Sequence, residues 1–355
     1  MINNPSVREI HRLLDRIQIS PDLFLAWISS DDNNALYEHL RSLINYTEGH
    51  TPTKLYRFRS CSTNSFQALN EDLLYLTRAD YFNDPYDCLL YFNADKLRNS
   101  ILNFISDENL LKYLQSANIQ FPIGDKFNTM DELLTFLLSK RDSFLDAVSE
   151  KFVSASNQLK ESTFIACLTE DVTSPVMWAH YADCHKGFAI EYEFPKDFFY
   201  PNPYHVTNVD YDWFGWRSLL PVLYDKFKPE GTELAEWYCF CAMFQETYKT
   251  DTSPNLCAFA NDLLLKTKLC LKKADIWSYE KEWRLVYTRE WPIKIEDDRA
   301  NTIYPASAIY LGSQISAENK TNLISIAKAK SIPVFETFVD YTSSTYALHT
   351  QMIAT

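Results

Sequence analysis

The sequence predicts an α+β fold, because strand-like and helix-like segments occupy separate stretches of the 355-residue chain. Four short segments, at 55–59, 164–168, 187–193 and 282–287, are rich in aromatic and β-branched residues and are typical of strands. Two other segments, 1–50 and about 95–160, repeat leucine and isoleucine at helical spacing and are typical of helices. We therefore expect the four strands to share one sheet.

The helical segments set the predicted domain organisation. Residues 1–50 form a helical N-terminal appendage, and a turn-rich linker follows it. Residues 53–345 form a single α+β domain. Within that domain, a helical insertion at about 95–160 separates the early strands from the later ones.

Composition narrows the classes of function. The net charge of −13 would repel nucleic acid and anionic lipid. The nearest approach to a basic patch, four lysines between Lys266 and Lys273, reads as the exposed side of a helix. No apolar run approaches the roughly 20 residues needed to span a bilayer, and the N-terminus carries no secretion signal. We therefore expect a cytoplasmic protein that does not enter a membrane, and the acidic charge argues against a nucleic-acid partner.

Glycine and cysteine usage excludes several kinds of ligand site. Only six glycines occur, and neither a dinucleotide-binding glycine motif nor a phosphate-binding loop is present. The eight cysteines contain no C-x-x-C pair, so a structural zinc site is not expected. Any nucleotide must therefore be held without a glycine-rich loop, and we expect no metal.

The most informative segment is Trp277–Tyr287. As a strand, it would place Glu280, Glu282 and Arg284 on one face and large apolar residues on the other. Two like charges on one face are unfavourable unless a cation, a ligand or solvent relieves them. The pattern therefore indicates part of a site; the alternative is an edge strand with a solvated charged face. We expect repulsion to raise the pKa of one carboxylate and Arg284 to keep the other ionised.

The strand at 55–59 offers binding groups for an anion. Arg57 and Arg59 share one face of it, and Tyr56 lies on the other. Guanidinium groups at a strand end suit bidentate binding of phosphate or carboxylate. An ordinary surface pair on an edge strand is the alternative.

A short helix and the strand before it supply neutral groups. The helix should begin at Pro175, capped by the preceding serine, and it places Trp178 and Tyr181 on one face with His180 nearby. Such an aromatic pair could form the floor of a pocket for a flat ring; taken singly, each ring would be ordinary core. Thr169 ends the strand and either presents a hydroxyl to a ligand or caps the next helix.

The turn Phe82–Asp87 combines asparagine, aspartate and proline, which cap and rigidify turns. We therefore expect a structural role for it. The alternative is that Asp84 and Asp87 help to bind a metal ion, but no further ligand stands at a diagnostic spacing.

Five motifs, in this order, resemble a bacterial family with a domain of unknown function, numbered twenty-nine seventy-one. The motifs are Leu55–Ser60, Phe82–Asp87, Met177–Tyr181 with Gly187, Trp277–Arg284 and Ile309–Gly312. The resemblance covers roughly residues 53–340 and leaves out the helical residues 1–50. It implies no activity.

More distantly, the motif order resembles the ADP-ribosyltransferase-like fold, which implies a split, mixed or antiparallel sheet. In that superfamily a first strand carries arginine or histidine, a second carries a hydroxyl followed by a helix, and a late strand carries glutamate. The resemblance implies that Arg57 or Arg59 binds a phosphate of NAD and that Thr169 lies near a ribose. A late glutamate would stabilise the oxocarbenium-like transition state as nicotinamide leaves. The Cys167-Leu168-Thr169 strand end and the long helical insertion depart from the family pattern.

These patterns lead to one main functional hypothesis. It is an NAD-consuming ADP-ribosyltransferase-like or NAD-glycohydrolase-like enzyme, acting as a toxin or defence effector, with Glu282 and Glu280 as catalytic residues. NAD is the substrate, and the partners are this small-molecule nucleotide and a macromolecular acceptor that the sequence does not name. The expected NAD-binding residues are Tyr56, Arg57, Arg59, Thr169, Trp178, His180, Tyr181 and Arg284.

Two alternatives stay open. One is a non-enzymatic module that senses a nucleotide through the arginine and aromatic groups. The other is a metal-assisted hydrolase or nuclease that uses Asp84, Asp87, His180 and Glu282.

The main hypothesis has two consequences. Residues far apart in the chain should line one cleft, namely Arg59, Trp178, Tyr181, Glu280 and Glu282. Glu282→Gln should abolish NAD turnover and hardly change thermal stability, because glutamine keeps the volume and removes repulsion. If Glu282 only pairs with Arg284, stability should fall and activity should persist.

Overall fold

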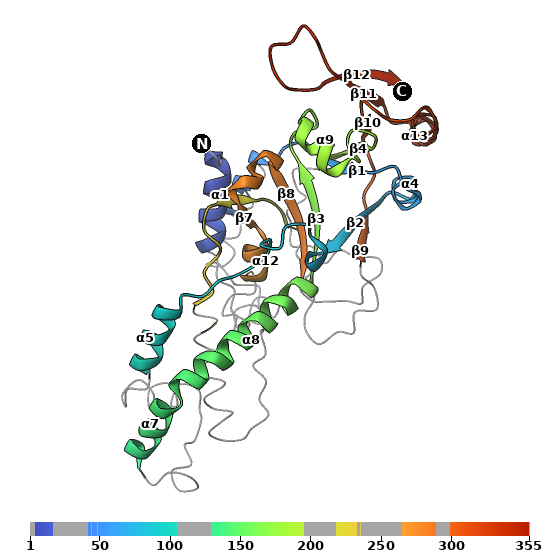
Figure 1. Cartoon of the computed structure of the whole chain (residues 1–355). Helices are drawn as coiled ribbons and strands as arrows, with labels where there is room; N and C mark the ends of the chain where they lie inside the picture. Colours follow the sequence, from blue (N-terminus) through green and yellow to red (C-terminus); the bar gives the residue numbers. More distant parts are fainter. Residues whose placement is uncertain are drawn as a thin grey trace, which may run out of the picture. The chain divides into compact units, whose positions relative to one another are not determined.

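The computed structural model describes residues 4–16, 42–43, 45–47, 49–104, 129–194, 218–232, 235, 265–288 and 299–354. The chain forms two compact units (Figure 1). The first comprises residues 1–88, 160–227 and 264–355, and the second comprises 89–159 and 228–263. The predicted helical insertion at 95–160 overlaps the second unit.

Within the described residues, the first unit contains a ten-stranded mixed sheet that is mostly antiparallel. Its order is β12-β11-β10-β4-β1-β3-β2-β9, with β8 beside β3 and β5 beside β8. The strands are β1 Lys54–Arg59, β2 Leu73–Arg78, β3 Thr163–Thr169, β4 Phe188–Glu193, β5 Ser218–Pro221, β8 Glu282–Thr288, β9 Arg299–Ile303, β10 Ala308–Leu311, β11 Val334–Phe338 and β12 His349–Ala354. The predicted α+β class is therefore confirmed, and the four predicted strands share one sheet.

One strand, β3, meets two different neighbours along a single edge. Thr169 at its end pairs with Tyr56 of β1, whereas Ile165 near its start pairs with Thr77 of β2. The other edge of β3 is paired with β8 over Thr163–Thr169, and Figure 1 shows these two strands side by side. Strands β1 and β2 therefore diverge beside the middle of β3. We call this divergence the fork.

Three helices of the first unit begin at serine caps. They are α4 Thr63–Asn70, α9 Pro175–Tyr181 and α13 Ala317–Lys330. The side chain of Ser174 accepts from the backbone N–H of Met177, and Pro175 occupies the first turn, as the sequence predicted for α9. Three consecutive residues after α9, Asp183 to His185, have left-handed φ values of 47° to 68°, and this turn returns the chain to β4.

Within the described part of the chain, a separate parallel sheet contains only two strands. It is formed by β6 Leu223–Asp225 and β7 Lys272–Ala274. The short elements α12 Leu265–Cys270 and η2 Asp275–Glu280 pack against it, whereas η1 Ala79–Tyr81 packs against β3. The sequence interpretation of Lys273 as the exposed side of a helix is wrong, because this residue lies on β7 and is buried.

The described part of the N-terminal appendage is mainly α1 Pro5–Arg16. Ile10 and Leu14 are buried, as expected for the apolar face. Between them in the chain, buried His11 contacts the carbonyl oxygen of Pro221 through Nε2 at 2.8 Å. Burial lowers the pKa of His11, so this contact ties the neutral ring to the end of β5.

The second unit is largely helical in its described residues. Its helices are α5 Ala94–Phe104, α7 Met130–Ser139 and α8 Arg141–Glu161. The rings of Phe92 and Phe152 pack edge to face with centroids 5.0 Å apart. No helix in the described ranges is both long enough and apolar enough to cross a membrane.

Candidate functional site

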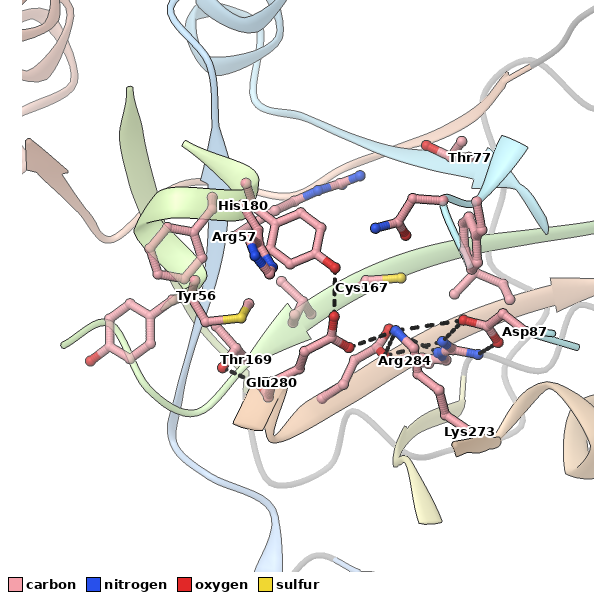
Figure 2. Close-up of a pocket in the computed structure, with 18 of the residues that line it drawn as sticks. Tyr56, Arg57, Thr77, Asp87, Cys167, Thr169, His180, Lys273, Glu280 and Arg284 are labelled. Atoms are coloured by element: carbon pink, nitrogen blue, oxygen red, sulfur yellow. Dashed lines mark hydrogen bonds and ion pairs between the residues drawn. The ribbon is translucent and has the colours of Figure 1, made fainter. Parts of the chain in front are cut away.

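A cavity of about 420 Å³ lies at the fork and draws residues from β1, β2, β3, α9, β7, η2 and β8 (Figure 2). Its volume is typical of small-ligand sites. The residues that line it are Tyr56, Arg57, Phe58, Arg59, Thr77, Tyr81, Phe82, Asn83, Asp87, Ile165, Cys167, Leu168, Thr169, Met177, His180, Tyr181, Lys273, Glu280, Glu282 and Arg284. All the residues that the sequence predicted for NAD binding or catalysis are among them, except Trp178.

Trp178 belongs to the core beneath the site. Its side chain is fully buried, and its Nε1 donates to the carbonyl oxygen of Val172 at 2.6 Å. Its ring packs edge to face on Phe58, with centroids 4.9 Å apart. The prediction that Trp178 lines the cleft is therefore wrong, and of the two aromatic residues on this helix only Tyr181 reaches the cavity.

Glu280 and Glu282 do not share a strand face. Glu280 ends η2, and β8 begins only at Glu282. Lys281 between them adopts a left-handed φ of 44°, which interrupts the alternation on which the sequence prediction depended. The two carboxylates nevertheless meet, because both contact one buried lysine.

That lysine is Lys273 of β7. Its Nζ lies 2.6 Å from Oε2 of Glu280 and 3.3 Å from Oε2 of Glu282, and 3.6 Å from Oδ2 of Asp87. The side chain is only 5 % exposed, and its Nζ also lies 5.0 Å from the centroid of the Trp277 ring. The sequence does not single this residue out, since nothing in its local pattern separates it from the other lysines between Lys266 and Lys273.

Arg284 completes the cluster and is fully buried. Its guanidinium donates to both carboxylate oxygens of Asp87, at 2.8 and 2.6 Å, and to both of Glu282, at 2.8 and 3.1 Å. Figure 2 shows these contacts as dashed lines between Arg284 and Asp87. The Phe82–Asp87 turn therefore has a structural task, which is to deliver Asp87 to a buried arginine 197 residues away.

The described residues offer no set of ligands for the metal-assisted hydrolase alternative. In the parts of the chain that the structure describes, no three histidine, cysteine, aspartate or glutamate side chains are grouped so as to hold a metal ion. Asp87 is engaged by Arg284. Asp84 instead accepts the backbone N–H of Tyr86 at 2.9 Å, as in an Asx turn.

The two glutamates titrate very differently. Burial raises the pKa of Glu280 to about 7, and the charge of Glu282 adds to this effect. Burial alone would also raise the pKa of Glu282, but Arg284 and Lys273 outweigh it and lower the pKa to about 2. The directions of both shifts agree with the sequence-based expectation, but burial, more than repulsion between the carboxylates, raises the pKa of Glu280.

Glu280 has two donors of its own. Its Oε2 accepts from Lys273, and its Oε1 accepts from the Tyr181 hydroxyl at 2.5 Å. The same burial and the neighbouring carboxylate raise the pKa of Tyr181, so this hydroxyl stays protonated. Both donors favour the ionised form of Glu280, whereas burial and the charge of Glu282 favour the neutral form.

The charges of this cluster can be counted. Lys273 and Arg284 supply two positive charges, and Asp87 and Glu282 supply two negative ones. These four groups are neutral together. Ionised Glu280 therefore gives the cluster a net charge of −1, and protonated Glu280 leaves it neutral.

Arg57 places an opposite charge in the same cavity. It is buried, at 7 % exposure, and one guanidinium nitrogen donates to the carbonyl oxygen of Tyr75. Among the described residues, no carboxylate forms an ion pair with it, and burial lowers its pKa. A buried guanidinium without a counter-charge is costly unless an anion binds to it.

Other predicted residues have partners within the protein. The Thr169 hydroxyl donates to the carbonyl oxygen of Glu280 at 2.6 Å and accepts from the N–H of Asp171. It therefore holds η2 against β3, and the predicted capping of the next helix by Thr169 is wrong, because Ser174 caps α9. His180 is exposed, and its Nδ1 lies 3.0 Å from the hydroxyl of Tyr279.

Gly187 allows the turn after α9 to pack against the end of β1. A Cβ at Gly187 would overlap the carbonyl oxygen of Arg59 and touch the backbone of Ala182. Only glycine therefore lets the turn after α9 lie directly on the strand that carries Arg57 and Arg59. This explains why Gly187 accompanies the α9 motif.

Comparison with known proteins gives one match. Residues 177–285 match the model of a family described as "Protein of unknown function (DUF2971)". This range contains the α9 motif and the Trp277–Arg284 motif, and the other three predicted motifs lie outside it. Neither a curated protein nor a solved structure matches the chain. Residues 177–285 are therefore similar to that family, as the motifs predicted for this part of the chain.

Proposed function

We propose that the fork cavity binds NAD and that the protein breaks its nicotinamide–ribose bond, passing the ADP-ribosyl group to water or to a macromolecular acceptor. One observation carries this. A buried arginine without a carboxylate partner among the described residues, Arg57, and a carboxyl group that titrates near neutrality, Glu280, face the same cavity (Figure 2). The first suits a phosphate and the second suits proton transfer.

Arg57 and Arg59 would bind the pyrophosphate. They are two positions apart on β1, so their Cα atoms are separated by about 7 Å on one face. Both line the cavity. An anion at Arg57 would supply the counter-charge that the protein does not, and charge-assisted bonds from guanidinium to phosphate are among the stronger hydrogen bonds.

Glu280 would act at the ribose. As the C1′–N bond breaks, its electron pair leaves with neutral nicotinamide, and positive charge develops on the ribose. The net charge of −1 of the cluster with ionised Glu280 would stabilise that charge among buried side chains. Glu280 would then take the proton of the attacking hydroxyl or water, for which a pKa near 7 is well matched. Glu282, held ionised by Arg284, would keep Lys273 in place.

The motif order adds support by analogy. Arginine on β1, a hydroxyl at the end of β3 followed by α9, and glutamates at and just before the start of β8 follow the order found in ADP-ribosyltransferase-like proteins. The fork lies where β1 and β2 diverge beside β3. A role as toxin or defence effector, and transfer to a macromolecular acceptor, rest on this resemblance alone.

The test is nicotinamide release from NAD, followed by chromatography at pH 8. Wild type should release nicotinamide, and Glu280→Gln should lower the rate about a hundredfold or more. Glu318→Gln, an exposed glutamate on α13, is the matched control and should leave the rate unchanged. Equal rates in wild type and Glu280→Gln would contradict the catalytic role.

A second candidate is a nucleotide-sensing module without turnover. It is favoured by the mutual neutralisation of Asp87, Lys273, Glu282 and Arg284, whose ionic groups all have partners inside the protein. The same experiment separates the two functions. A sensor would bind NAD or ADP-ribose in calorimetry and release no nicotinamide.

A further inference from the structure

A second cavity adjoins the first along β1 and β2. It encloses about 520 Å³ and is lined by Arg59, Ser62, Asn64, Ser65, Ala68, Tyr75, Thr77 and Tyr81. Three of these residues, Arg59, Thr77 and Tyr81, also line the fork cavity. These three residues form a common boundary, with Glu280 in the lining of the first cavity and helix α4 in that of the second.

The two cavities differ in their chemistry. The fork cavity contains three carboxylates, a lysine and three buried or part-buried arginines. The second is lined by hydroxyls, one amide, aromatic rings and a single guanidinium, that of Arg59 at the boundary. Neutral donors and acceptors suit sugar hydroxyls and the edges of a base, whereas a guanidinium suits phosphate.

The boundary also carries an aromatic surface. Tyr81 of η1 is 53 % exposed, and the guanidinium carbon of Arg78 lies 4.8 Å from its ring centroid. An aromatic ring at the mouth of a polar cavity can stack with a flat heterocycle. From the first cavity to the second, the lining thus offers arginines suited to phosphate, then an aromatic ring and neutral polar groups.

Given the proposed function, we infer that NAD spans both cavities. The nicotinamide ribose lies at Glu280, the pyrophosphate lies at Arg57 and Arg59, and the adenosine half occupies the second cavity beside α4. The ligand class is therefore a dinucleotide, and a mononucleotide fills only the first of the two spaces.

The test compares two unreactive ligands by calorimetry on the full chain. ADP-ribose contains the adenosine half, and ribose 5-phosphate lacks it. Wild type should bind ADP-ribose about tenfold more tightly or better, a difference of about 1.4 kcal/mol. Ser65→Leu and Ala68→Leu, which place bulk in the second cavity, should reduce ADP-ribose affinity to that of ribose 5-phosphate. Gln67→Leu, on the same helix but outside the lining, should change neither affinity.

The outcomes separate the two proposals. Undiminished ADP-ribose affinity in both filled variants, or no preference for ADP-ribose in wild type, would overturn the inference. Loss of ADP-ribose affinity in Ser65→Leu and Ala68→Leu, in a wild type that releases no nicotinamide from NAD, would support the second cavity and overturn the proposed catalysis. Thermal melting of each variant identifies a fold defect, and Ser65→Leu is the decisive variant if Ala68→Leu fails to fold.

Discussion

Replacing Glu280 by glutamine should make stability less dependent on pH. The carboxyl group has a pKa of about 7 in the folded protein, against an ordinary value of 4.5. Because the folded pKa is raised, the folded state binds more protons than the unfolded state between these values, so wild-type stability falls as pH rises through this range. At about 1.4 kcal/mol per pKa unit, the loss from Glu280 amounts to about 3 kcal/mol. Glutamine does not ionise, so the variant should lack this loss.

The measurement is urea unfolding of wild type and Glu280→Gln at pH 5, 6, 7 and 8, extrapolated to water. The difference between the free energies of unfolding, variant minus wild type, should grow by about 3 kcal/mol between pH 5 and pH 8. Other titrating groups cancel in this difference. Curves that run parallel across the whole range would show that Lys273 and Tyr181 keep Glu280 ionised throughout, and would refute the reasoning about its role as a base.

Three further substitutions test the cluster around the cavity. Glu282→Gln should lose about 3 kcal/mol of stability at pH 7, because Arg284 lowers the Glu282 pKa from 4.5 to about 2. In urea unfolding, the difference in stability between wild type and variant should shrink as pH falls from 4.5 towards 2. A variant as stable as wild type at pH 7 would contradict this. Arg57→Met removes a buried charge, so melting should show stability unchanged to within about 1 kcal/mol, whereas calorimetry should show about tenfold weaker ADP-ribose binding; a large loss of stability would indicate a structural arginine. Gly187→Ala should destabilise by about 1–3 kcal/mol through overlap with the Arg59 carbonyl, and unaltered unfolding would count against that packing.

The stability expected for Glu282→Gln is the reverse of the sequence-based expectation. From the sequence, Glu282 is one of two repelling carboxylates, so glutamine should relieve repulsion. In the structure, both oxygens of Glu282 are bound by Arg284, and Lys273 is close by. Removing the charge leaves two buried cations short of one partner, which is the costly case for a buried ion pair.

Sequence by itself determined the local elements and which residue types meet. Alternation identified β1, β3, β4 and β8, and a serine followed by proline marked the start of α9. Arg57, Arg59, Glu280, Glu282 and Arg284 were all predicted for one site, and all line one cavity. The elements could be predicted because strand alternation and capping at a helix end depend on neighbours in the chain.

Only the tertiary structure decided how those charges are partnered. Asp87 is 197 residues from Arg284, Lys273 lies on a separate strand before Glu280, and no local pattern links either of them to Arg284. The left-handed Lys281 takes Glu280 off the strand, and Trp178 turns into the core whereas Tyr181 reaches the cavity. A pKa, an ion pair and the lining of a cavity depend on which residues pack opposite a side chain. Those neighbours are brought together by the packing of distant strands at the fork, and sequence periodicity does not determine them.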